Sequence, residues 1–257
     1  MRFASLGSGS QGNALVVEAG GTRVLLDCGF SVRDAGSRLA RAGLSPADLA
    51  GIVVTHEHAD HADGVFALAC RFGIPVWLTH GTLAATRETN GEVGAECRVH
   101  FVSPGEEFAL GDLVIQPFTV PHDAREPVQY VIGDGARRLG VLTDAGSSTA
   151  HIEASLSGCD ALVLECNHDL GMLMNGEYPP ALKARVASRL GHLDNAASAA
   201  ILAALDRRRL RHVIAAHLSQ KNNTPELARA ALAAALDCAP EWVSVATQDE
   251  GFDWREM

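Results

Sequence analysis

The segment that most constrains this chain is Thr55–His61, which places three histidines and two acidic residues directly after the apolar run Ile52–Val54. The β-branched run predicts a strand, so the polar side chains gather at a strand end. Buried polar groups need partners, and a pair of divalent metal ions would partner every one of these. Imidazole suits zinc, iron or manganese. The segment therefore predicts a hydrolytic metal site with open positions; the alternative is a solvated polar loop.

Composition narrows the class of protein. The chain has 257 residues, 47% of them hydrophobic, which fits one α/β domain over residues 1–257. No apolar run approaches the roughly 18 residues of a membrane span, and the N-terminus does not resemble a signal peptide. We therefore expect a cytoplasmic protein that does not engage membranes. The net charge of −10 gives no global reason to bind nucleic acid, although a local basic patch can act inside an acidic protein.

The six cysteines are scattered, and we predict them reduced and mostly buried. They are Cys28, Cys70, Cys97, Cys159, Cys166 and Cys238. The dense basic run Arg207–Arg211 is interpreted as a solvated helix end, whose cations would face the negative end of the helix dipole.

Hydrophobic periodicity predicts alternating strands and helices. Strands are expected at residues 3–6, 14–18, 24–26, 75–78, 98–102, 107–110, 113–120, 128–132, 139–142, 161–164, 212–216 and 244–247. Helices are expected at residues 32–43, 65–72, 148–157, 181–190, 196–206 and 225–236. The loop Gly7–Asn13 could cradle a phosphate with its N–H groups and hydroxyls, or it could be a plain hairpin turn.

Further histidines and acidic residues follow other predicted strands. His122, Asp144, Glu165 and His217 each stand at or just beyond such an end, and rigid strands position side chains that are distant in sequence. A carboxylate such as Glu165 that orients an imidazole such as His192 would make a general acid able to protonate a departing alkoxide.

His-x-His-x-Asp-His after a hydrophobic strand resembles the signature of the metallo-β-lactamase superfamily. The resemblance implies a four-layer αββα sandwich and two divalent metal ions, zinc or manganese. It assigns His56, His58 and His122 to the first metal and Asp60, His61 and His217 to the second, with Asp144 bridging the two. Asp27 resembles the carboxylate that supports the metal loop without ligating.

Several segments together resemble the YycJ (WalJ, VicX) family of bacterial metallo-β-lactamase-fold proteins. They are Ser5–Ser10 with Gly12-Asn13, Glu165–Asp169, Gly191–Asn195 and His217–Ser219 with Asn222-Asn223. The segment around His192, with Glu165 on the preceding strand, is also similar to ribonuclease Z. The resemblance implies a 5′-to-3′ DNA exonuclease in which a metal-bridging hydroxide attacks phosphorus. Asp60 would orient that hydroxide, and His192, supported by Glu165, would protonate the leaving oxygen.

Donor-rich loops supply the candidates for substrate binding: Ser8, Ser10, Asn13, Lys183, Arg185, Asn222 and Asn223. DNA is the expected substrate, with RNA or a small phosphodiester as alternatives. A small-molecule cyclic phosphodiesterase, which the acidic charge favours, is the main rival. A thioesterase or lactamase-type hydrolase and a catalytically silent regulatory protein are further alternatives. The sequence leaves the metal, the cleavage polarity and the oligomeric state open.

Overall fold

Two mixed β-sheets dominate the computed structural model, which describes residues 1–91, 94 and 97–257. The first sheet is ordered β14 (Phe252–Glu256), β1 (Arg2–Gly7), β2 (Ala14–Ala19), β3 (Thr22–Leu26), β4 (Gly51–Val53), β5 (Val76–Leu78) and β6 (Val99–Phe101). The second is ordered β13 (Ser244–Val245), β12 (His212–Ala216), β11 (Ala161–Glu165), β10 (Arg138–Leu142), β9 (Val128–Gly133), β8 (Leu113–Thr119) and β7 (Phe108–Leu110).

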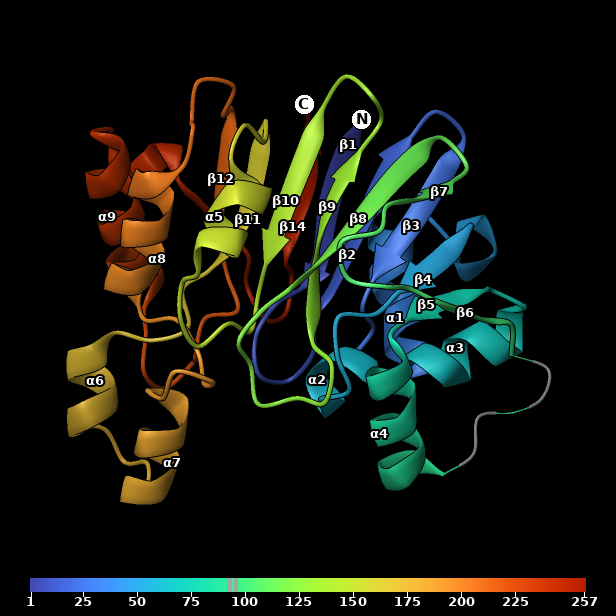
Figure 1. Cartoon of the computed structure of the whole chain (residues 1–257), viewed down its shortest axis with the longest axis horizontal. Helices are drawn as coiled ribbons and strands as arrows, with labels where there is room; N and C mark the ends of the chain where they lie inside the picture. The colour runs from blue at the N-terminus through green and yellow to red at the C-terminus, as the bar shows by residue number, and fades with distance from the viewer. Residues whose placement is uncertain (92–93, 95–96) are drawn as a thin grey trace.

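Helices cover the outer face of each sheet, which gives the four-layer αββα sandwich that was predicted (Figure 1). The helices are α1 (Val32–Arg41), α2 (Ala59–Ala62), α3 (Val65–Phe72), α4 (His80–Asn90), α5 (Ala150–Leu156), α6 (Leu170–Asn175), α7 (Pro180–Val186), α8 (Asn195–Ala204) and α9 (Pro225–Leu236), with short 3₁₀ turns at Pro46–Asp48 and Pro240–Trp242. Among the described residues, no helix has the length and apolar character needed to cross a membrane.

Three apolar clusters hold the layers together. The central one lies between the sheets and includes Phe3, Val53 and Tyr130. A second packs α5, α8 and α9 on the second sheet, and a third packs α1, α3 and α4 on the first. Because both faces of each sheet are covered, the central strands carry continuous apolar runs, which explains why periodicity located them well.

Strand direction determines where the site forms. β10, β11 and β12 are mutually parallel, as are β3, β4 and β5. The residues that follow β4, β10, β11 and β12 all meet at one end of the sandwich, beside α2 (Figure 1). The two termini lie at the opposite end, where β1 pairs with β14.

The structure corrects several sequence expectations. The helices α4 and α6 and the strand β14 were not predicted. These segments are short or weakly periodic, so tertiary packing decides them. Cys70 and Cys97 form a disulfide; the prediction that all six cysteines are reduced is wrong for this pair, because residues 27 positions apart meet where α3 packs near β6.

The basic run Arg207–Arg211 is not a helix end, since α8 finishes at Ala204 and β12 starts at His212. Its arginines are paired individually: Arg209 with the buried carboxylate of Asp160, and Arg208 with Asp206. The run precedes β12, whereas the site residue His217 follows that strand. These cations therefore stabilise the far end of the sheet.

Candidate metal centre

The histidine-rich motif adopts an extended segment followed by one helical turn. After β4 the chain runs through His56 and reaches α2, for which His58 is the N-cap. Asp60 and His61 then lie on the helical turn itself. The turn packs tightly on the preceding loops, since Asn13 N donates to Asp60 O at 2.7 Å and Cys28 N donates to His61 O at 2.8 Å. A Cβ atom at Gly29 would overlap the Asp60 carbonyl, so only glycine permits this approach.

His56, His58 and His122 form the first group of side chains that could hold a metal. His122 Nε2 lies 3.2 Å from His58 Nδ1. The other nitrogen of each ring faces a carbonyl, at Gly191 for His122 and at Asp123 for His58. If those outer nitrogens donate, the two inner nitrogens present lone pairs to each other. His56 Nε2 is buried beside them without a hydrogen-bond partner.

Asp60, His61 and His217 form a second group, and Asp144 lies between the two. Asp60 Oδ2 is 3.1 Å from His217 Nε2 and 3.5 Å from His61 Nε2. Asp144 Oδ2 approaches His61 Nε2 to 2.7 Å, and its Oδ1 lies 3.5 Å from His217 Nε2. Asp144 also joins His56 and His61 in a third candidate group, so its carboxylate lies between the two groups. Together these side chains are called the cluster: His56, His58, Asp60, His61, His122, Asp144 and His217.

Donor chemistry fits divalent cations at these positions. Three imidazole nitrogens that converge on one point form a metal-binding arrangement when none of them carries a proton. Burial and neighbouring imidazoles lower the pKa of His56 well below its ordinary value, which keeps it neutral. Burial alone would also lower the pKa of His61, but the carboxylates of Asp144, Asp60 and Asp27 raise it well above its usual range. The same negative field attracts dications, which displace such protons on binding.

An outer layer of hydrogen bonds orients the cluster. Asp27, whose φ of 59° is in the left-handed region, accepts from Thr55 N and Thr55 Oγ1 at 2.8 Å each, and its Oδ2 lies 2.8 Å from His61 Nδ1. Thr55 Oγ1 is also 2.9 Å from His56 Nδ1. Such contacts set the tautomer and orientation of metal-binding histidines.

Two members of the cluster itself carry strained backbone. Asp144 and His217 have φ values of 58° and 54°. Left-handed backbone costs about 1–3 kcal/mol for residues other than glycine and concentrates at functional sites. Each of these residues follows a parallel strand, and the reversal turns its side chain back over the sheet end. Strand rigidity and local strain together fix the two side chains.

Glu165 and His192 form a hydrogen-bonded pair next to Asp144. His192 Nδ1 lies 2.8 Å from Glu165 Oε1 and 3.1 Å from Asp144 Oδ1. The second Glu165 oxygen accepts from Ala145 N at 2.8 Å, so the fully buried carboxylate is fixed. Burial lowers the pKa of His192, but the bonds to Asp144 and Glu165 outweigh it and raise that pKa to about 11.

A cavity of about 270 Å³ opens over the cluster. Its lining includes His58, Asp60, Asp144, His192 and His217, together with Ser10, Asp123, Tyr178 and Arg185. His192 thus presents one ring edge to the pair of carboxylates and another to the cavity. A substrate entering the cavity would meet the cluster and this imidazole together.

Some of the predicted substrate-binding residues line the cavity, and others are bonded within the protein. Ser10 and Arg185 line the cavity, whereas the Lys183 ammonium donates to Met174 O. Ser8 and Asn13 are buried and bonded within the protein: Ser8 Oγ donates to Asn13 Oδ1 and accepts from His217 N at 2.9 Å. The loop Gly7–Asn13 therefore supports the cluster from beneath.

The predicted pair Asn222 and Asn223 is also engaged in the framework. Asn223 exchanges two side-chain amide bonds of 2.9 Å with Asn195, and Asn222 Nδ2 donates to Ser219 Oγ. Since both are buried, they hold the loop before α9 and do not face the cavity. The sequence of a polar loop does not show which of its hydrogen-bond donors are already bonded within the protein.

Sequence reasoning missed three residues of the site. Thr55 and Asn167 contact histidines of the cluster: Thr55 Oγ1 is bonded to His56, and Asn167 Nδ2 lies 3.2 Å from His217 Nδ1. Tyr178 lines the cavity. Thr55 could have been suspected from its place between the strand and the motif, but Asn167 and Tyr178 carry no pattern that distinguishes them from loop residues.

Comparison with known proteins identifies the class. Residues 22–217 match the family described as the beta-lactamase superfamily domain. The metallo-beta-lactamase fold protein YhfI of Bacillus subtilis superposes with a TM-score of 0.75 at 17% identity, covering 100% of this chain and 99% of that one. Zn(2+)-bound PqqB of Methylobacterium extorquens gives 0.75 at 18% identity over 100% of both chains. The chain thus belongs to the metallo-β-lactamase superfamily.

Sequence similarity identifies the family within this superfamily. The chain is 35% identical over 237 residues to exodeoxyribonuclease YycJ of Bacillus anthracis, which covers 92% of this chain and 89% of that protein. It is 33% identical over 229 residues to exodeoxyribonuclease WalJ of Streptococcus pneumoniae, covering 88% and 85%. Within the superfamily, this chain is a member of the YycJ/WalJ family.

Proposed function

We propose that this chain is a metal-dependent exonuclease that hydrolyses DNA phosphodiesters in the cytoplasm, with 5′-to-3′ polarity and two divalent ions, zinc or manganese. The observation that carries the proposal is the convergence of imidazole nitrogens and acidic oxygens beside a Glu165–His192 pair, under one cavity that is lined by members of both groups. The names of the relatives YycJ and WalJ support deoxyribonucleic acid as the substrate.

Two ions would be held by side chains from four segments. His56, His58 and His122 would hold the first ion, and Asp60, His61 and His217 the second, with Asp144 shared. When bound, such a pair lowers the pKa of water and neutralises the charge of the reacting phosphate.

The remaining steps belong to the chain's own residues. Asp60, one of whose carboxylate oxygens lies within 3.1 Å of His217, orients the attacking water. His192 holds a proton against Glu165 and Asp144 and delivers it to the leaving 3′-oxygen, which is a poor leaving group without protonation. The Glu165 carboxylate, fixed by Ala145 N, keeps the imidazole aimed at the cavity.

The proposal is tested with purified protein, zinc or manganese, and end-labelled DNA and RNA of the same sequence. We expect stepwise release of nucleotides from one end of DNA, abolished in His58→Ala. Phe72→Ala, which removes an exposed side chain that does not line the cavity, is the matched control. Metal-dependent turnover of a cyclic phosphodiester without any turnover of DNA would refute the nuclease.

A further inference from the structure

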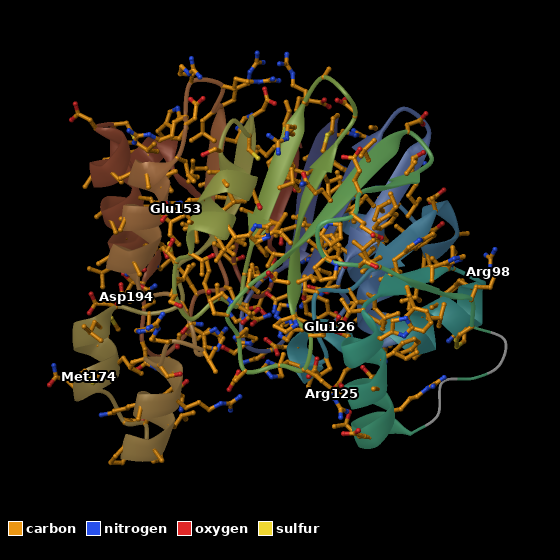
Figure 2. The ribbon with its side chains drawn as sticks, in the orientation of Figure 1. Arg98, Arg125, Glu126, Glu153, Met174 and Asp194 are labelled. Carbon is orange, nitrogen blue, oxygen red and sulfur yellow. A yellow bond between two sulfur atoms is a disulfide. The ribbon has the colours of Figure 1, made fainter. Side chains whose placement is uncertain are left out.

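The segment Leu170–Leu190, hereafter the arm, is inserted between Glu165 and His192. It contains α6 and α7 and extends beyond the sandwich beside the metal centre (Figure 1). Figure 2 shows Met174 of the arm and Arg125 with Glu126 on opposite sides of this end of the molecule. Leu173 is the buried residue of α6, and no residue of α7 is buried. Core packing therefore does not explain why the arm is built as it is.

Tyr178 lies in the connection between α6 and α7 and lines the cavity. It is followed by Pro179 and Pro180, which fix their own φ angles and restrict the residue before each of them. The backbone that carries the ring is therefore restricted, and the ring itself is half-buried. A rigid aromatic ring loses little conformational entropy when it binds a flat partner.

One cation lies near this ring and a second lines the same cavity. Lys221 Nζ lies 5.9 Å from the centre of the Tyr178 ring, and the Arg185 guanidinium, whose side chain is 61% exposed, reaches the cavity from α7. The floor of the same cavity is acidic, with Asp60, Asp123 and Asp144. In a chain of net charge −10, this pairing of an aromatic ring and cations at the rim fits a base and its phosphate.

Arg185 is tied directly to the metal centre. Its Nε donates to Asp123 Oδ2 at 2.6 Å, and Asp123 Oδ1 lies 3.6 Å from His122 Nε2. One carboxylate thus fixes the distance between the α7 guanidinium and the cluster where phosphate would react.

We propose that the arm selects a single-stranded nucleic-acid end, with the terminal base stacked on Tyr178 and its phosphate facing Arg185. This deepens and rests on the proposed nuclease function. A base can reach the ring only when it is unpaired, and the cavity of about 270 Å³ has no room for a duplex. Paired ends must therefore fray before they react.

The test compares wild type, Tyr178→Ala and Tyr178→Phe on three substrates: a single-stranded oligonucleotide, the same strand with an abasic terminal nucleotide, and bis-p-nitrophenyl phosphate. For Tyr178→Ala on the intact strand we expect KM to rise about 5- to 150-fold with kcat little changed, the equivalent of about 1–3 kcal/mol of stacking. Tyr178→Phe should behave as wild type. Phe72→Ala is the matched control for loss of an exposed aromatic side chain.

The abasic strand and the small diester distinguish the loss of base stacking from general damage to the active site. Both lack a base to stack, so Tyr178→Ala should leave their kinetics unchanged. Arg185→Gln should instead raise KM equally for the intact and abasic strands, and it should reduce the salt dependence of binding by about one phosphate contact. These paired results distinguish a base contact from a phosphate contact.

Equal losses on all three substrates, or no loss on the intact strand, would overturn the inference. So would a duplex with blunt ends that is cleaved as fast as the single strand. Failure of the nuclease proposal has another signature: wild type would cleave no oligonucleotide while still hydrolysing bis-p-nitrophenyl phosphate. The inference would then fall with it.

Discussion

Replacing His192 by alanine removes the proposed proton donor and leaves the proposed metal ligands in place. The imidazole Nδ1 contacts Glu165 and Asp144 at 2.8 and 3.1 Å, and 22% of the side chain is exposed toward the cavity. We therefore expect kcat on DNA to fall about 10²- to 10⁴-fold, the usual contribution of a general acid. At 1.36 kcal/mol per tenfold, the barrier rises by about 2.7–5.4 kcal/mol.

The departing group provides the internal control. DNA releases an alkoxide that needs a proton, whereas bis-p-nitrophenyl phosphate releases a stable phenolate that does not. The variant should therefore hydrolyse the aryl diester at nearly the wild-type rate. Glu165→Gln should give the same pattern more weakly, since it removes one charge-assisted hydrogen bond worth about 1.5–3 kcal/mol.

The pH profile carries the same signature. Burial lowers the pKa of His192, but Asp144 and Glu165 outweigh it and raise that pKa above its ordinary value. Its proton is therefore bound at neutral pH, and DNA cleavage should be lost as pH rises through the raised pKa. Glu165→Gln lowers this pKa, so the alkaline limb moves toward neutral pH. Stopped assays on both substrates, with metal content measured for each variant, decide the matter. Equal loss on both substrates, or loss of metal, would show that His192 is a ligand, as its place beside Asp144 also permits.

Three further predictions concern the framework. Asp27→Asn, which weakens the support of Thr55 and His61, should reduce metal affinity about 10- to 100-fold, and unchanged affinity in chelator competition would contradict the assigned role. Chelation should lower Tm, and zinc or manganese at about 100 times its Kd should restore about 2.7 kcal/mol; a Tm indifferent to chelator argues against a metal centre. Cys97→Ser should cost about 2–4 kcal/mol of unfolding free energy in denaturant titration, and wild type in reductant should match it; if reductant leaves wild type unchanged, the Cys70–Cys97 bond does not contribute.

Local chemistry was sufficient for the first half of the site. Residues 56–61 could be recognised as a metal-binding segment because a folded protein has little structural reason to place so many histidines and acidic residues directly after one apolar strand. The same reasoning located the β10, β11 and β12 ends that carry Asp144, Glu165 and His217, since buried parallel strands are continuous apolar runs. The N-caps Asp194 and Thr224 depend on local sequence in the same way, because their side chains accept from a backbone N–H three residues further on.

What the sequence could not decide depends on partners distant along the chain. Ser8, Asn13, Asn222 and Asn223 are donors like Ser10 and Arg185, yet folding occupies the first four inside the protein and leaves the other two at the cavity. The disulfide of Cys70 and Cys97 likewise depends on where α3 and β6 meet. Sequence specifies which groups are available and at which strand ends they stand. Tertiary structure decides which of them are bonded within the framework and which face the cavity, because a hydrogen bond forms only when both partners are brought within reach.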